Sequence, residues 1–196
     1  MAMKRAITRE DLMPLPEYAK VRAARRQAVV ARKQHRRLEV GPVATFHFED
    51  YDSMWLQVQE MLYIEKGGEE QIAGELKAYN PLIPNGRELV ATVLFEIDDP
   101  ARRAALLARL GGIEETAFIR VDGETIKGRS EADIDRTSAD GKASAVQFIH
   151  FPFTPTQIAR FRRPDAQIVV GFSHPAYGHM AVMPEQVRAA LADDFD

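Results

Sequence analysis

Residues 88–98 read Glu-Leu-Val-Ala-Thr-Val-Leu-Phe-Glu-Ile-Asp, and this stretch is the clearest evidence for the fold class. Its alternate positions are apolar and share one face of a β-strand: Leu89, Ala91, Val93, Phe95 and Ile97. Residues 145–153 are apolar on both faces, which is typical of a central strand. Asp122-Gly123, between strand-like runs over 116–121 and 124–127, predicts a tight hairpin. Strands joined by hairpins, without regular alternation with helices, predict an α+β domain with a mainly antiparallel sheet and flanking helices.

Shorter patterns supply the remaining elements. Further strands are expected over residues 38–40, 43–48, 166–172 and 180–183. Helices are expected over about 54–66, 69–79, 155–163 and 184–192, with one more from Asp98 or Asp99 to Leu110. Asp52 or Ser53 is expected to cap the first of these helices. Residues 80–86 predict a rigid loop and residues 128–142 a polar loop.

The strand over 43–48 has two chemically different faces. Phe46 and Phe48 point to one side, which predicts burial in a core. Thr45, His47 and Glu49 point to the other side. The sequence therefore predicts that an imidazole and a carboxylate share one face of a sheet.

Charge is distributed unevenly along the chain. Residues 1–37 hold 11 Lys and Arg residues against 3 Asp and Glu residues, a net charge of +8, whereas the remainder carries −11. A helix over about 17–36 would gather most of the cations in one broad arc, with a narrow apolar face of Val21 and alanines. We therefore predict a basic helical arm, residues 1–37, followed by a single α+β domain, residues 38–196. The cations expected to dock on a partner are Arg22, Arg25, Arg26, Arg32, Lys33, Arg36 and Arg37.

An arm of this charge is attracted to something anionic. Its own acidic body or a second subunit is the first candidate, an acidic protein partner the second, and nucleic acid the third. Nucleic acid ranks last because no aromatic residues interleave the basic stripe and no helix-turn-helix pattern surrounds it. The cations could also simply keep one helix face solvated.

The turn over residues 174–179 carries two imidazoles and a phenol, from His174, Tyr177 and His179. Turns on rigid scaffolds often hold functional side chains, and imidazole moves protons or binds metals near neutral pH. The alternative is a surface turn in which His174 caps backbone groups and Tyr177 packs. Glu60 has Leu56 and Ile64 four residues away on either side, so it is either a desolvated carboxylate or a residue on a wetter helix face.

These residues suggest a metal site of imidazole and carboxylate ligands. Such ligands favour iron, manganese or zinc, whereas the absence of cysteine excludes a self-ligated iron–sulfur cluster. The predicted ligands are Glu49, Glu60, His174 and His179. The residues expected to line the site are His47, Tyr79, Asn80, His150 and Tyr177, although a lone strand histidine is more often a hydrogen-bonded core or rim residue.

Several classes of protein lack support in the sequence. It contains no glycine-rich phosphate loop, no dinucleotide-binding fingerprint and no nucleophile elbow, so whether it is an enzyme stays open. No run approaches the roughly 18–20 apolar residues of a membrane span. No apolar segment follows the N-terminal charges, so there is no sign of a signal peptide and a cytoplasmic location is expected.

Five segments carry a resemblance to a known family: residues 7–12, 48–50, 59–61, 78–86 and 174–177. The Tyr-Asn-Pro-Leu-Ile-Pro stretch within 78–86 is the most specific of them. With these segments the chain resembles the bacterial family known as domain of unknown function 3501. The resemblance implies a small cytoplasmic protein linked to redox or oxygen-stress metabolism, with a rubrerythrin-like protein or an iron–sulfur oxidoreductase as partner. It implies no catalytic residues.

Three hypotheses follow. The first is an accessory or binding protein of a redox system, acting as a homo-oligomer and docking an acidic partner through its basic helix. The second is a metal-dependent redox enzyme or sensor. The third is nucleic-acid binding by the arm.

Overall fold

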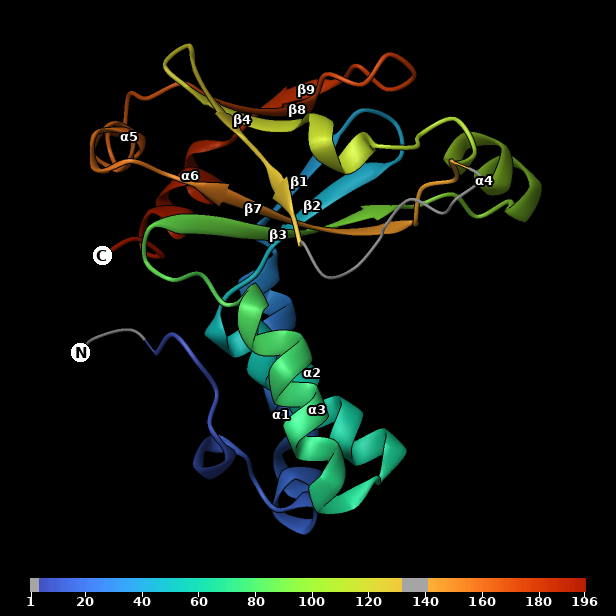
Figure 1. Cartoon of the computed structure of the whole chain (residues 1–196). Coiled ribbons are helices and arrows are strands. Elements are labelled where there is room, and N and C mark those ends of the chain that lie inside the picture. Colours follow the sequence, from blue (N-terminus) through green and yellow to red (C-terminus); the bar gives the residue numbers. More distant parts are fainter. Residues whose placement is uncertain (1–3, 132–140) are drawn as a thin grey trace.

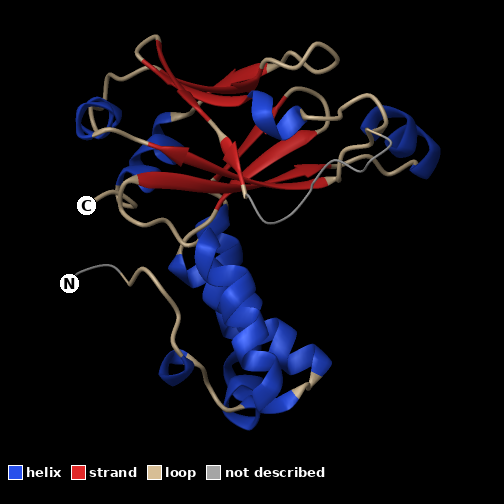
Figure 2. Cartoon of the chain, in the orientation of Figure 1, coloured by secondary structure: helices blue, strands red, loops and turns tan. Residues whose placement is uncertain are grey.

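The computed structural model describes residues 4–131 and 141–196 and shows an α+β fold with two antiparallel sheets, as the sequence predicts. Figure 1 shows the two sheets stacked at one end of the molecule. Helices α1 (Leu15–Lys33), α2 (Tyr51–Glu65) and α3 (Gly68–Tyr79) project from the outer side of one sheet. Figure 2 shows the same separation of strands from the helical projection. Helices α4 (Pro100–Leu107), α5 (Pro155–Phe161) and α6 (Glu185–Ala192) flank the sheets.

The first sheet has the strand order β1-β2-β3-β7-β6. Its strands are β1 (Arg37–Val40), β2 (Ala44–Phe48), β3 (Glu88–Phe95), β7 (Val146–Pro152) and β6 (Arg129–Ser130). The residues predicted for the central strand, 145–153, form β7, which pairs with both β3 and β6. Strand β3 ends at Phe95, earlier than the predicted Asp98. Of the loop expected over 128–142, Arg129–Ser130 forms β6, and residues 132–140 lie outside the described residues.

The second sheet has the strand order β5-β4-β8-β9. Its strands are β5 (Glu124–Lys127), β4 (Ala117–Val121), β8 (Ile168–Phe172) and β9 (Met180–Val182). The hairpin at Asp122-Gly123 is confirmed, and both residues have positive φ, as a tight two-residue turn requires. The inner faces of the two sheets share one core, to which β2 contributes Phe46 and Phe48 as predicted.

The helical projection has a core of its own. It comprises α1 (Leu15–Lys33), α2 (Tyr51–Glu65) and α3 (Gly68–Tyr79), packed around Met54, Val58 and Leu62. This second core reaches the outer face of the first sheet at Val90 and Phe148. The projection is therefore seated on the sheet face opposite the main core.

Several helix boundaries differ from the sequence prediction; α4, for example, ends at Leu107 rather than at the predicted Leu110. Helix α2 begins at Tyr51 because Asp50 is its cap: Asp50 accepts a 2.8 Å hydrogen bond from the Ser53 amide, and the Ser53 hydroxyl accepts one from the Asp50 amide. Helix α1 ends at Lys33, before Arg36. The prediction that this helix continues to residue 36 is therefore wrong for its last turn. Arg36 leads into β1 instead.

Arg36 is 3% exposed and has acceptors from several segments. Its guanidinium donates to the carbonyls of Phe48 and Glu49 at 3.1 and 3.0 Å and to Asp194 at 2.5 Å. It also reaches the Ala190 carbonyl in α6. A buried guanidinium with this many acceptors ties the root of the projection to the C-terminal segment.

Glu60 lies at the contact between α1 and α2. It accepts two 2.8 Å hydrogen bonds from Arg22 and one of 2.5 Å from the Tyr18 hydroxyl. The hydrogen bonds from Arg22 lower the pKa of Glu60 from 4.5 to about 2, against the opposing effect of burial. Glu60 is thus a charged, paired carboxylate that holds α1 on α2.

We expect Arg36→Ala to lower the free energy of unfolding by about 3–5 kcal/mol, because it leaves the buried carboxylate of Asp194 and three carbonyls without their donor. Urea denaturation followed by circular dichroism measures this. The matched control is Arg37→Ala, at the adjacent but exposed residue, which is expected to change stability by no more than about 0.5 kcal/mol. Equal effects of the two substitutions would contradict the structural role of Arg36.

We expect Glu60→Gln to cost about 1–2 kcal/mol at neutral pH, after allowance for solvent screening. A carboxyl with a lowered folded pKa stabilises the protein above its unfolded pKa, and this contribution is lost as pH falls through the folded pKa. The difference between wild type and variant should therefore shrink between about pH 4.5 and 2. Glu70→Gln, at an exposed position of α3, is the control and should show no such trend.

Candidate functional site

A cleft of about 310 Å³ lies where the helical projection meets the first sheet. We call it the sheet–helix cleft. Its polar or charged lining residues are Lys33, His47, Glu49, Gln57, Tyr79 and Thr92. Its apolar lining residues are Met54, Leu82, Leu94, Val146 and Phe148. Helices α1, α2 and α3 and strands β2, β3 and β7 all contribute, so the cleft exists only in the assembled fold.

The register of the sheet places the strand residues of the cleft. His47 on β2 is opposite Thr92 on β3, and Thr92 is opposite Phe148 on β7. Because side chains alternate along a strand, these three lie on the outer face while Phe46 and Phe48 fill the main core. The cleft floor therefore runs from polar residues at β2 to apolar residues at β7.

Glu49 organises the polar end of the cleft. It is 3% exposed, and its two carboxylate oxygens accept hydrogen bonds from Thr92 at 2.7 Å and Ser53 at 2.6 Å. The ammonium of Lys33, at the end of α1, is 3.8 Å from the same carboxylate. Glu49 thereby fixes groups from β3, α2 and α1 in one place.

His47 is the group whose hydrogen bonding is incomplete. Its Nε2 atom is buried and has no hydrogen-bond partner among the residues that the structure describes. Burial lowers the pKa of His47 below 6.5, and the charge of Lys33 lowers it further, against the opposing effects of Glu49 and Glu96. The imidazole is therefore neutral at pH 7, and an unpaired polar atom of this kind costs roughly 1–3 kcal/mol.

The remaining walls are supplied by the helices. Met54 and Gln57 come from α2, one turn apart, and Tyr79 ends α3. The amide of Gln57 donates a 3.3 Å hydrogen bond to the Tyr79 hydroxyl across the two helices. The geometry resembles that of small-molecule sites, which are mostly apolar with a few placed polar groups.

The structure brings together three of the predicted site residues, His47, Glu49 and Tyr79, and adds Lys33 from the predicted docking set. It does not bring together the four predicted metal ligands. Glu60 is paired with Arg22 between α1 and α2, whereas the turn of His174 and His179 follows β8 in the second sheet. No group of three or more His, Asp or Glu side chains within residues 4–131 and 141–196 is arranged to hold a metal ion.

The turn over residues 174–179 has structural contacts. The Nδ1 atom of His174 accepts from the Ala176 amide at 3.1 Å, and its Nε2 lies 3.2 Å from the Gly111 carbonyl. The Tyr177 hydroxyl donates to the Val40 carbonyl and accepts from the amides that start β2. The ring of His179 packs edge-on against Tyr177 at 4.5 Å. These contacts match the alternative in which His174 caps backbone groups and Tyr177 packs.

The other two predicted lining residues lie outside the cleft lining. The side chain of Asn80 accepts from the Ile7 amide at 2.7 Å and donates to the Ile7 carbonyl at 3.0 Å, which holds the N-terminal segment on the projection. His150 on β7 lies 3.1 Å from Glu88 on β3. Both are hydrogen-bonded within the fold.

Four of the seven cations predicted for docking contact acidic side chains of the same chain: Arg22, Arg32, Lys33 and Arg36. Arg32 meets Asp50, and the charges of Arg36 and Arg32 hold the pKa of Asp50 below its ordinary value despite burial. Arg25 lies over the Trp55 ring at 5.2 Å. Arg26 and Arg37 are exposed.

The sequence prediction missed Gln57, Thr92 and Phe148 as cleft residues. The alternation of residues 88–98 places Thr92 on the outer face, but which residues of β2 and β7 lie opposite depends on the register. Gln57 is recognisable only once the packing of α2 is known.

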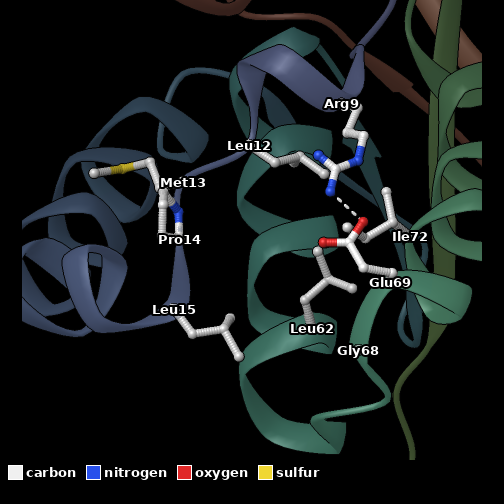
Figure 3. A pocket seen from close by; sticks show the side chains of 9 residues that line it. All are labelled: Arg9, Leu12, Met13, Pro14, Leu15, Leu62, Gly68, Glu69 and Ile72. Carbon is white, nitrogen blue, oxygen red and sulfur yellow. Dashed lines mark hydrogen bonds and ion pairs between the residues drawn. The ribbon is translucent and has the colours of Figure 1, made fainter.

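A second groove, of about 350 Å³, lies at the far end of the projection. Figure 3 shows its apolar walls, including Leu12, Leu62 and Ile72, with Arg9 and Glu69 paired across it. Its two charged groups satisfy each other, and none of the predicted site residues lines it. The sheet–helix cleft is therefore the stronger candidate site. None of the described helices is long and apolar enough to cross a membrane.

Comparison with known proteins places the chain among relatives of similar length. It is similar to a protein of unknown function from Burkholderia pseudomallei K96243, solved by crystallography at 1.90 Å resolution. The two are 38% identical with a TM-score of 0.90, covering 97% of this chain and 100% of the other. The curated proteins gave no match. Residues 6–195 match the family model of DUF3501, described as a protein of unknown function, which confirms the resemblance found in the sequence. The chain belongs to the DUF3501 family.

Proposed function

We propose that this protein binds a small organic molecule in the sheet–helix cleft. The observation that carries the proposal is that Lys33, at the end of α1, meets His47 and Glu49, at the end of β2, in a cleft whose other lining residues are mostly apolar. A volume of about 310 Å³ lies at the lower end of the range for small-molecule sites, roughly 300–1,000 Å³.

The polar groups of the cleft are already positioned. Glu49 is held by Thr92 and Ser53, and Gln57 is bonded to Tyr79. Such prior fixing lowers the conformational entropy that binding must remove, so it supports recognition of a ligand.

A second proposal concerns a macromolecular partner. The accessory role in redox or oxygen-stress metabolism, with a cytoplasmic location and a homo-oligomeric state, rests on the family resemblance and the charge of α1. Arg25, Arg26 and Arg37 are the members of the predicted docking set that are exposed and carry no ion pair to a described residue, and of these Arg25 already lies over the Trp55 ring. An acidic partner would approach Arg26 and Arg37.

We expect Val146→Phe to weaken ligand binding at least tenfold, because a phenyl ring at this position of β7 fills the cleft. The measurement is ligand-observed NMR of the full chain with a library of anionic, cationic and neutral fragments. The control is Val182→Phe, a substitution at a 63% exposed position of β9 in the other sheet, which should leave binding unchanged. The proposal fails if no fragment binds, or if all that bind do so equally well to both variants.

For the partner proposal, we expect the combined Arg26→Glu and Arg37→Glu substitutions to reduce binding to a rubrerythrin-like protein from the same genome at least tenfold. Wild-type binding should also weaken as salt rises from about 0.05 to 0.5 M, since exposed charges are screened. Isothermal titration calorimetry measures both effects. Arg129→Glu, on β6, is the control. Binding that is absent, or insensitive to salt and to these substitutions, would contradict this proposal.

A further inference from the structure

We propose that a second copy of this chain pairs with β9 along the edge that faces away from β8, so that the second sheets of two protomers join into one continuous sheet. We call this edge the β9 edge. The inference concerns a surface outside the sheet–helix cleft. It rests on the homo-oligomeric state proposed above and names the surface that forms it.

Strand β9 carries two of the most exposed large apolar side chains of the described residues. Met180 is 59% exposed and Val182 is 63% exposed. Because they are two residues apart in a strand, they share the outer face of the second sheet, whereas Ala181 between them packs against the main core. Val169 on β8 lies opposite Val182, so the two exposed side chains continue an apolar strip of the sheet.

The other edge strands of the two sheets are charged. The strands at the ends of the sheets are β1, β6, β5 and β9. The first three have exposed charged side chains, which are Arg37, Glu39, Arg129, Glu124 and Lys127. Charged side chains on an edge strand hinder its pairing with another chain. Among these four strands of the described chain, β9 alone has no charged residue.

The hydrogen bonds between β8 and β9 show which backbone groups of β9 face its edge. The His179 carbonyl accepts a hydrogen bond from β8 at 2.9 Å, and the Met183 amide donates one to β8 at 2.8 Å. Hydrogen-bonded and non-hydrogen-bonded pairs alternate along antiparallel strands, so Met180 and Val182 belong to non-hydrogen-bonded pairs. The N–H and C=O groups of Met180 and Val182 therefore point away from β8.

These outward groups have no backbone partner within the described residues. Strand β1 of the first sheet packs close to β9, but no backbone hydrogen bond joins the two strands. Backbone groups without a protein partner are nearly always hydrated, and both residues are more than half exposed. The β9 edge is therefore open to water, which the backbone of another strand can replace.

A second copy of the chain is the occupant that this geometry fits. In an antiparallel pair with its two-fold axis at Ala181, Met180 of one protomer lies opposite Val182 of the other, and their outward groups form hydrogen bonds. The exposed apolar side chains then meet across the two strands, and no charged side chain of either β9 is involved. Pairing with β1, β5 or β6 of another copy would instead place charged side chains beside Met180 and Val182.

The resulting interface is short and closed. Pro184 is the next residue whose backbone would face the β9 edge, and it has no N–H to donate. The opposite end of the second sheet is the charged strand β5, so association stops at two copies. A pairing of so few residues buries less than the roughly 1,600 Å² of a standard interface, so we expect a reversible dimer in the micromolar range.

Sedimentation velocity of the full chain from about 1 to 300 µM measures the monomer–dimer equilibrium. We expect Val182→Pro to weaken the dimer about tenfold, because it removes one outward N–H from each protomer. Proline is tolerated on edge strands where the N–H faces solvent, so the monomer stays folded. The matched control is Thr125→Pro on β5, whose N–H also points away from its sheet, and this substitution should leave the dimer unchanged.

A second variant tests the side chains. The combined substitutions Met180→Lys and Val182→Lys place like charges opposite each other in the dimer, so we expect the dimer to be lost at low salt. Raising the salt concentration should restore part of it, since exposed charges are screened. A thermal melt of each variant confirms that it is folded.

Each outcome supports or overturns a defined part of the proposal. A chain that stays monomeric over the whole concentration range overturns both the surface and the proposed homo-oligomeric state. A dimer that neither variant weakens overturns the surface alone. A dimer lost in the lysine variant but unchanged by Val182→Pro overturns the joined sheet, because the apolar side chains then meet without strand pairing. None of these results bears on ligand binding in the sheet–helix cleft.

Discussion

The buried guanidinium of Arg36 is the interaction on which the arrangement of the molecule depends. It donates hydrogen bonds both to the carbonyls at the end of β2 and to the carboxylate of Asp194 near the C-terminus. Lys33 lies at the end of α1, shortly before Arg36, and the acceptors of Arg36 include the carbonyl of Glu49 itself and that of Phe48, the residue after His47. The geometry of the sheet–helix cleft is therefore set by a contact that lies outside the cleft, at the root of the helical projection.

The sequence predicted individual strands and turns well, because their patterns depend on residues that are neighbours in the chain. Alternation along residues 43–48 placed His47 and Glu49 on the outer face, and Asp122-Gly123 specified its hairpin. What it could not predict was contact between distant segments. That Tyr79 meets the His47 face, or that Arg36 turns inward, depends on how α1 to α3 sit on the sheet. The cap of α2 is Asp50 rather than the predicted Asp52 or Ser53. Its carboxylate is stabilised by Arg32 and Arg36, which lie outside this helix, so the local sequence pattern does not reveal that support.

The ion pairs of α1 explain much of the uneven charge of the chain. A large part of the N-terminal excess is matched by acids of the same chain, through Arg22 with Glu60 and Arg32 with Asp50. The acids of both pairs are largely buried, and these pairs fix the placement of α1. A net charge computed over a segment therefore overstates what that segment can offer to another molecule.

The cleft also lies at the boundary between two hydrophobic cores, one inside the sheets and one inside the helical projection. The two cores meet through the first sheet, where Val90 and Phe148 lie on strands but pack with the helical cluster. A molecule bound there would contact both the sheet and the helical projection and would hold the projection on the sheet. Its binding would slow amide exchange along the whole of α2 and α3, including turns that do not line the cleft, since local opening of the projection would first have to release it.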